Sequence, residues 1–326
     1  PKAVTVSIRV ADPTDPTDPT DPTDPTDPTD PTDPTDPGVE PFTATALTVF
    51  PAGATELDPD IKPVGSAVDP ATGLVYVANE MRPARVHVVD PKTDTVVRVL
   101  SAPTLDPAQD GLRDIAFDPA SGNLTVGFGD SWVVMDAETG AKVSGPLSFG
   151  PGGVRGMDVD PAGDRVFGAL RQSGFEVRKA STGELITLVE GPADGGAWRS
   201  HGIAYDAEND LIYVSNSDAA GSTEGIRVYR GSDYTLVDRL AYANADFRSI
   251  AVDPAADTVV VGHQGIIFDN SGVSLYTGDL ELVERLEENR YGNKVYGVSI
   301  DPATHALYVS ARDRYPVGLI QVTLPE

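Results

Sequence analysis

A short passage recurs six times along the chain, and the last two residues of each copy are an aspartate and, in five of the six, a proline. The copies are Gly65–Pro70, Asp114–Pro119, Gly156–Pro161, Gly202–Ala207, Ser249–Pro254 and Gly297–Pro302. Their marker aspartates, Asp69, Asp118, Asp160, Asp206, Asp253 and Asp301, lie 49, 42, 46, 47 and 48 residues apart. A period in this range is typical of propeller blades or of helical arrays. The repeat therefore restricts the chain to an architecture built from similar units.

The contents of one repeat decide between these two architectures. In the second repeat, β-rich runs at 114–117, 124–128 and 132–136 alternate with turns rich in Gly, Asp and Asn, and a fourth run begins near Lys142. Such runs predict strands, and stretches with helical periodicity are almost absent. Four antiparallel strands form one propeller blade. The sequence therefore predicts an all-β fold, a six-bladed β-propeller of four-stranded antiparallel blades over residues 39–326.

The first strand of each repeat has one bulky and one slim face. In the fourth repeat, for example, Ile203 alternates with Gly202 and Ala204. Strands crowded around an axis need such a taper. Asp114 and Asp158 occupy two of the small positions, so we expect both carboxylates to point into the inner region.

The sixth repeat lacks a fourth strand of its own. Runs at 307–311 and 318–323 supply only its second and third strands, whereas an unassigned strand-like run, Thr43–Phe50, precedes the first repeat. We expect this N-terminal strand to complete the last blade. Such a closure joins the two ends of the propeller and removes free sheet edges.

Three repeats carry a sequence motif in their second strand. Residues 75–79 read Val-Tyr-Val-Ala-Asn, residues 212–216 read Ile-Tyr-Val-Ser-Asn, and residues 307–311 read Leu-Tyr-Val-Ser-Ala. These residues resemble the Tyr-Val-Thr-Asn (YVTN) repeat family of β-propellers, which occurs in surface and secreted proteins of bacteria and archaea. The resemblance implies a propeller fold and a secreted or surface location. Because the family includes binding, structural and a few enzymatic members, it does not select an activity.

A different repeat precedes the propeller. Asp-Pro-Thr occurs eight times over 12–35, and Asp-Pro-Gly at 36–38 ends the tract. Proline at every third position fixes φ and removes N–H donors, and the nine unpaired aspartates repel one another. We expect residues 12–38 to be an extended, polyproline-II-like linker. At ~3.1 Å per residue, about 25 residues would span roughly 80 Å.

Residues 1–11 are expected to form an isolated β-strand. Val4, Val6, Ile8 and Val10 alternate with polar residues and create an apolar face that a lone strand cannot bury. Two interpretations remain open. The segment is either the last strand of an upstream domain or a donor strand that adds to a sheet of an identical subunit.

Composition excludes several classes of function. The chain of 326 residues has 24 basic and 50 acidic side chains, a formal net charge of −26. This balance argues against binding to nucleic-acid phosphates or anionic lipid. The absence of cysteine excludes disulfides, thiolate metal sites and a cysteine nucleophile. No apolar run approaches the roughly 18 residues of a membrane helix, so we expect no membrane insertion.

One register position collects polar side chains on this acidic background. Five residues before the marker aspartates stand Val64, Arg113, Arg155, His201, Arg248 and Tyr296. First strands begin together at one mouth of a propeller channel, so these side chains should form a ring there. Because arginine forks suit carboxylate and phosphate, the ring predicts a site for an anion or a sugar acid. Alternatively, the arginines neutralise Asp114 and Asp158.

The candidate ligand-binding residues are therefore Arg113, Arg155, Trp198, His201, Arg248 and Tyr296. Trp198 is included because it lies just ahead of His201, and an aromatic beside arginine is common at binding hot spots. Its alternative role is to plug the channel or pack between blades.

No catalytic or metal-binding set of residues stands out. His201 and His263 fall on the same face of neighbouring blades, which leaves a metal site with Asp218 or Asp269 as a weaker alternative. The chain has no Gly-x-Ser-x-Gly elbow, phosphate loop or EF-hand spacing. We expect no cofactor, with calcium on the acidic turns as the one candidate.

These observations favour a noncatalytic module for binding, adhesion or structural assembly, held on a stiff acidic spacer outside the cell. The expected locations are the cell surface, the cell wall or a virion surface, and the expected partner is a protein or a glycan. One alternative is a hydrolase or lyase that acts on a small anionic or sugar-acid substrate at the channel mouth. Another is a fibre or layer subunit that polymerises through Val4, Val6, Ile8 and Val10.

Overall fold

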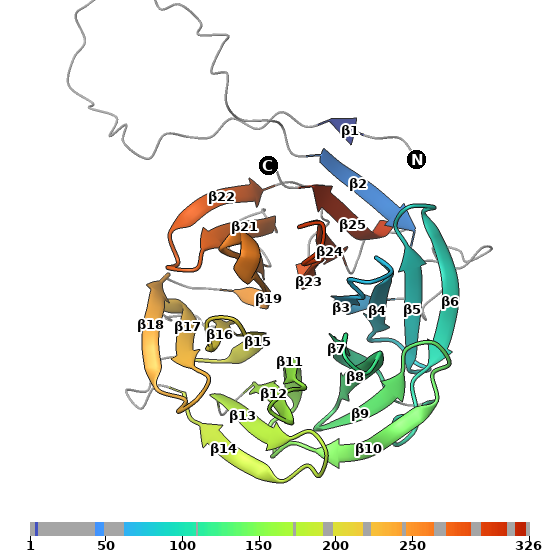
Figure 1. Cartoon of the computed structure of the whole chain (residues 1–326), viewed down its shortest axis with the longest axis horizontal. Helices are drawn as coiled ribbons and strands as arrows, with labels where there is room; N and C mark the ends of the chain where they lie inside the picture. Colours follow the sequence, from blue (N-terminus) through green and yellow to red (C-terminus); the bar gives the residue numbers. More distant parts are fainter. Residues whose placement is uncertain are drawn as a thin grey trace, which may run out of the picture.

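Six antiparallel sheets surround a central axis, which confirms the predicted six-bladed β-propeller (Figure 1). The computed structural model describes residues 4–5, 43–48, 62–108, 110–171, 174–191, 198–217, 223–242, 246–263, 272–287, 295–311 and 317–323. Within these residues the only helical segment is a short 3-10 turn, Pro254–Ala256. None of the helices among them is long and apolar enough to cross a membrane.

In blades 1 to 5 the chain runs from the innermost strand to the outermost one. Blade 1 contains β3 (Pro63–Val68), β4 (Val75–Asn79), β5 (Arg85–Asp90) and β6 (Thr95–Ser101). Blade 2 contains β7 (Leu112–Asp118), β8 (Asn123–Phe128), β9 (Ser131–Asp136) and β10 (Lys142–Ser148). Blade 3 contains β11 (Val154–Asp160), β12 (Arg165–Leu170), β13 (Gly174–Lys179) and β14 (Leu185–Val189).

The second half of the ring repeats this order. Blade 4 contains β15 (Ser200–Asp206), β16 (Leu211–Asn216), β17 (Glu224–Arg230) and β18 (Leu236–Ala241). Blade 5 contains β19 (Phe247–Asp253), β20 (Thr258–His263), β21 (Gly272–Thr277) and β22 (Leu282–Glu287). Blade 6 contains β23 (Val295–Ile300), β24 (Leu307–Ala311) and β25 (Val317–Thr323).

The N-terminal strand β2 (Thr43–Thr48) completes blade 6, as the sequence predicts. It pairs antiparallel with β25, with Thr43 opposite Thr323 and Leu47 opposite Leu319 (Figure 1). Leu47 is buried beside residues of blades 1 and 6. The first and last parts of the propeller are therefore joined by backbone hydrogen bonds within one sheet.

A fifth strand, β1 (Val4–Thr5), lies on the outer edge of β2. Val4 pairs with Ala44 and Thr5 pairs with Thr43, both antiparallel. The sequence leaves open an upstream domain or another subunit as the partner of residues 1–11, and here two of these residues pair with the same chain. The rest of the segment and the linker at 12–38 lie outside the described residues.

The marker aspartates cap the turn between the first two strands of each blade. In blade 1, Asp69 Oδ1 accepts from the Ala71 amide at 2.9 Å and Oδ2 accepts from the Thr72 hydroxyl at 2.7 Å. Equivalent bonds are made by Asp118, Asp160, Asp206, Asp253 and Asp301. A short side-chain acceptor at the first position of a turn satisfies amides that the strands cannot. The recurring aspartate therefore has a structural role.

Bulky and slim faces of the inner strands pack as the sequence predicts. Ile203 and Tyr205 contact blade 3, where the Tyr205 ring lies 5.0 Å from that of Phe167. On the opposite face, a Cβ on Gly156 would collide with the His201 carbonyl oxygen, and a Cβ on Gly297 with that of Val64. The absence of a side chain at these positions lets the backbones of neighbouring inner strands approach each other.

We predict that Gly297→Ala destabilises the propeller by about 1–3 kcal/mol, because the new methyl group must displace the backbone of Val64. The measurement is the free energy of unfolding in urea. Gly122→Asn is the matched control, since Gly122 has φ +70° with open space around it and asparagine tolerates this conformation. Equal free energies for the two variants would contradict the close approach of the strands.

Candidate anion-binding site

One mouth of the channel contains a cavity of about 210 Å³ with a mostly basic lining. Its lining residues are Glu80, Arg155, Arg171, Arg199, His201, Ser217, Arg248 and Tyr296. They come from two places in the blades, the start of the inner strands and the first residues after the second strands. Four arginines thus face a single glutamate in this lining.

A β-bulge places the predicted ring residues. The pairing of all six inner strands shifts register near the position five residues before the marker aspartate. In blade 3, for example, Val154 pairs with Leu170 and Gly156 pairs with Ala169, so Arg155 has no partner in the register. A bulge turns one side chain away from the regular alternation of a strand. The repeated bulge therefore explains why one sequence position supplies the ring.

Arg155 is the least compensated cation of the site. No hydrogen bond or ion pair joins its side chain to any other residue that the structure describes. Burial lowers the pKa of Arg155, and the nearby charges of Arg113, Arg171 and Arg248 add to this effect, whereas Glu80 opposes it. A half-buried cation surrounded by other cations favours an anion in the adjoining space.

Two other ring arginines have carboxylate partners. Arg113 forms an ion pair with Glu80 and lies outside the lining of the cavity. Arg248 Nε lies 2.8 Å from Asp246 Oδ1, and its guanidinium lies 5.8 Å from the centre of the Tyr296 ring. These contacts hold the two arginines in place, and the paired carboxylates offset their positive charge, in contrast to Arg155.

His201 is a neutral, buried side chain. Its Nδ1 lies 2.5 Å from the carbonyl oxygen of Arg248, so Nδ1–H is the donor and Nε2 is the unprotonated nitrogen. Nε2 in turn lies 3.5 Å from Arg248 Nη1. Burial lowers the pKa of His201 well below its usual value, and the charges of Arg248 and Arg155 lower it further.

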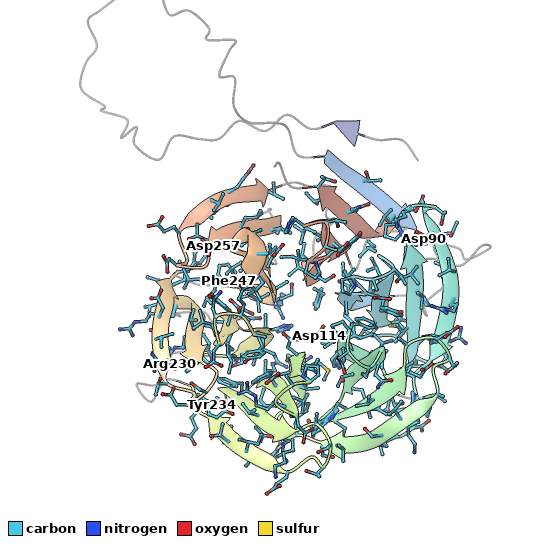
Figure 2. The ribbon with its side chains drawn as sticks, in the orientation of Figure 1. Asp90, Asp114, Arg230, Tyr234, Phe247 and Asp257 are labelled. Atoms are coloured by element: carbon cyan, nitrogen blue, oxygen red, sulfur yellow. The ribbon has the colours of Figure 1, made fainter. Side chains whose placement is uncertain are left out.

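Asp114 and Asp158 lie deeper in the channel and bridge neighbouring blades. Asp114 accepts from the amides of Ile115 and Met157, both at 2.9 Å. Asp158 accepts from the amides of Val159 at 2.8 Å and Tyr205 at 2.7 Å. Figure 2 shows Asp114 near the axis. The described partners of both carboxylates are backbone amides, and arginine is not among them.

Burial raises the pKa of both channel aspartates. The pKa of Asp114 rises to about 7 and that of Asp158 to about 6, although the amide hydrogen bonds act in the opposite direction. Both groups therefore titrate near neutral pH.

Trp198 lies outside the lining of the cavity. Its indole Nε1 donates to Ser200 Oγ at 2.8 Å, its ring packs with the buried residues of blades 3 and 4, and the Arg227 guanidinium lies 5.0 Å from its centre. This placement agrees with the packing role that the sequence offers as the alternative. The remaining predicted residues Arg155, His201, Arg248 and Tyr296 come together at the cavity.

The candidate residues from the sequence did not include Glu80, Arg171, Arg199 and Ser217, although Arg199 was the arginine beside Trp198. Three of them share a register position, since Glu80, Arg171 and Ser217 each follow the last residue of a second strand, in blades 1, 3 and 4. Aligning the ends of the second strands, as well as the starts of the first, would have found them.

His263 lies away from the cavity, at the end of β20. Its Nε2 lies 3.3 Å from Ser274 Oγ, and burial lowers its pKa to about 4. Across the described residues, no group of three His, Asp or Glu side chains is arranged to hold a metal ion. Asp218 and Asp269 lie outside the described residues, so the metal and calcium alternatives stay predictions.

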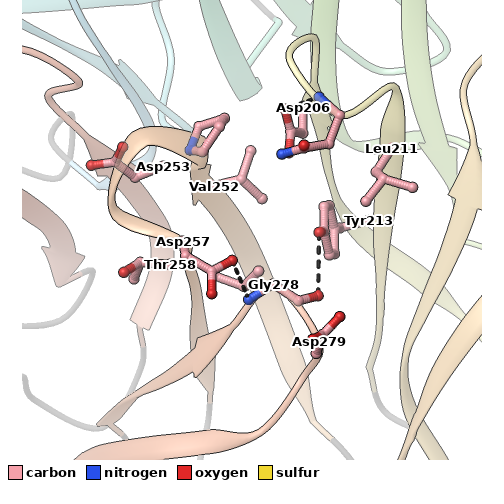
Figure 3. A pocket seen from close by; sticks show the side chains of 12 residues that line it. Asp206, Leu211, Tyr213, Val252, Asp253, Asp257, Thr258, Gly278 and Asp279 are labelled. Atoms are coloured by element: carbon pink, nitrogen blue, oxygen red, sulfur yellow. Dashed lines mark hydrogen bonds between the residues drawn. The ribbon is translucent and has the colours of Figure 1, made fainter.

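A second cavity of about 210 Å³ lies between blades 4 and 5 and is acidic (Figure 3). Its lining includes Asp206, Asp253, Asp257 and Asp279. The carboxylates of Asp206 and Asp253 cap their own turns, and Asp257 Oδ1 accepts from the Gly278 amide at 3.1 Å. This cavity repels anions, so the arginine-lined mouth is the candidate anion site.

The comparisons with known proteins bear on the fold and not on the function. No family model matches the chain, and no curated protein matches it in sequence. The similarity to YVTN repeat proteins therefore stays a prediction. Among solved structures, Kuenenia stuttgartiensis hydrazine synthase is similar over 80% of this chain and 77% of that chain, with 16% identity and a TM-score of 0.58. At this identity the similarity shows a shared fold alone.

We predict that wild-type protein loses stability relative to Asp114→Asn as pH rises from 5 to 8. The pKa of Asp114 in the folded state is about 7, whereas its ordinary value is 3.8, so the folded state holds this proton more tightly than the unfolded state does. The resulting contribution to the free energy of unfolding is greatest below pH ~4 and is lost as pH rises through ~7. The limiting slope for one proton is about 1.4 kcal/mol per pH unit. The measurement is urea unfolding at several pH values.

The control for this comparison is the exposed Asp130, because Asp130→Asn removes a carboxylate without changing the channel. Its difference from wild type should vary little over the same range. A pH-independent difference for Asp114→Asn would mean that this carboxylate keeps its charge throughout.

Proposed function

We propose that this propeller is a noncatalytic binding module that holds a small anionic ligand in the arginine-lined cavity. The observation that carries the proposal is Arg155, a half-buried cation next to three other arginines and without a carboxylate partner among the described residues. An anion that enters the cavity would gain charge-assisted hydrogen bonds without first breaking an ion pair of Arg155.

The lining favours a carboxylate on a small polyhydroxy compound, such as a sugar acid. A guanidinium fork matches the geometry of a carboxylate, while Ser217, Tyr296 and Glu80 provide groups that can bond hydroxyls. A volume of about 210 Å³ is below that of typical drug-binding pockets, which start near ~300 Å³. The cavity therefore suits one sugar unit, for example the acidic end of a glycan.

The chemistry of the cavity supports binding over hydrolysis or elimination. His201 donates through Nδ1 to a backbone carbonyl, and its Nε2 faces a guanidinium, so it is poorly placed to take up a proton. Glu80 is paired with Arg113. A hydrolase or lyase needs a base with access to the substrate, and these two side chains are the imidazole and the carboxylate of the lining.

We further propose that the module works outside the cell, on a cell surface, cell wall or virion. The support for this part is the sequence. A linker of repeated Asp-Pro-Thr is solvated, acidic and extended, properties that suit display of a binding domain at a distance from its anchor. An acidic glycan or a glycosylated protein partner would then make this a module of adhesion.

We predict that D-glucuronate binds and that Arg155→Gln weakens this binding about tenfold or more, because a hydrogen bond to a charged group contributes about 1.5–3 kcal/mol. Isothermal titration calorimetry measures both affinities. The uncharged methyl ester of the same sugar should bind much more weakly than the acid.

Arg230→Gln serves as the matched control, because Arg230 lies at the periphery with an exposed side chain (Figure 2). It should leave the affinity for glucuronate unchanged. If the acid and its ester bind equally, or if both variants lose the same affinity, the cavity is not an anion site.

We also predict no turnover of uronide glycosides or of sugar-acid lactones by the wild-type protein. Release of reducing sugar or of an unsaturated product is measured over long incubations at high protein concentration. Activity that disappears in His201→Ala and persists in Arg230→Gln would instead establish the hydrolase or lyase.

A further inference from the structure

Only part of the outer edge of β2 is paired. β1 covers Thr43 and Ala44 of this six-residue strand, and the other four residues have no partner on that side among the described residues. An edge strand with unpaired amides and carbonyls is a template for another strand. The pairing with Val4 and Thr5 shows that this edge accepts the N-terminal segment.

The register in which β1 pairs with β2 of the same chain assigns the apolar residues of the N-terminal segment to the exposed face of the sheet. Leu47 of β2 is buried, whereas Ala46 is exposed. Because residues two apart share a face, the pairing of Val4 with Ala44 assigns the alternating apolar residues to the face of Ala46. A shift by three residues, which places Val4 opposite Leu47, assigns them to the face of Leu47 instead and extends the pairing over the whole of β2.

The sequence of the linker opposes pairing within one chain. Residues 6–42 separate β1 from β2, and the eight Asp-Pro-Thr units lie in between. Self-pairing requires the two ends of this segment to meet. Proline and like charges favour an extended rod of roughly 80 Å, so the local concentration of the segment at its own β2 is low. A segment from a second copy reaches the same edge without folding the rod back.

We propose that β2 accepts the N-terminal strand of a second copy of this chain, in the register Val4 opposite Leu47, Val6 opposite Thr45 and Ile8 opposite Thr43. Each copy then donates one strand and accepts one, which gives a head-to-tail chain of propellers separated by linkers. This assembly is independent of the anion site, which lies at the channel mouth in blades 1, 3, 4, 5 and 6.

The chain has no cysteine, so a crosslink tests this register directly. Two single variants, Val6→Cys and Thr45→Cys, are mixed and oxidised. We expect a disulfide-linked heterodimer, at least about tenfold faster than between Val6→Cys and Arg230→Cys on the rim. If the double variant forms the disulfide within one chain and the mixture does not, the strand belongs to its own propeller and the proposal fails.

Assembly of the full chain provides the second test, by light scattering and electron microscopy over a concentration series. We expect wild type to form oligomers that Val6→Pro combined with Ile8→Pro abolishes, because proline removes amides from the donor strand. Thr17→Pro combined with Thr20→Pro, in the linker, is the matched control and should assemble like wild type. A wild type that stays monomeric, or oligomers that survive the strand prolines, would overturn the proposal.

The role of the rod is tested by replacing residues 12–35 with a Gly/Ser sequence of equal length. A flexible linker raises the local concentration of the strand at its own β2. We therefore expect assembly to require at least about tenfold more protein. Unchanged assembly would contradict the step of the proposal that assigns the strand to a neighbour.

Discussion

The pairing of β2 with β25 is the constraint on which the rest of the propeller depends. It joins residues 43–48 to 317–323 in one sheet and closes the ring with backbone hydrogen bonds, in a chain without cysteine. Only in a closed ring do six inner strands converge on one axis. The close backbone approaches at Gly156 and Gly297, and the amide bridges from Asp114 and Asp158, depend on that convergence.

The same convergence concentrates charge. Each inner strand carries a bulge at the same position, and three of these six positions hold arginine. Around the ring, Arg113 forms an ion pair with Glu80 and Arg248 forms one with Asp246, whereas the side chain of Arg155 has no carboxylate partner among the described residues. On a chain with a net charge of −26, this mouth is a local exception. The proposal of an anionic ligand follows from that difference in compensation rather than from the number of arginines.

The two proposals concern opposite parts of the blades. The anion site uses the inner strands, where closure fixes the side chains, while strand exchange uses the outer edge of blade 6, where β1 occupies two of six positions. A module with one recognition site at its axis and one donor strand on a long linker could present many copies of the site along a fibre. Weak binding of single sugar acids would then add up to strong attachment to an acidic glycan.

The sequence by itself determined the blade count, the closing strand and the position of the ring, because these follow from the repeat period, the missing fourth strand and the alternation of large and small residues. The sequence could not decide which arginines of the ring form an ion pair with a carboxylate. Glu80 and Ser217 come from loops after second strands, and Trp198 packs beneath Arg227 instead of lining the cavity. Ion pairing depends on distances between blades that are far apart in sequence, so only the tertiary structure decided that Arg155 is the ring arginine without a carboxylate partner among the described residues.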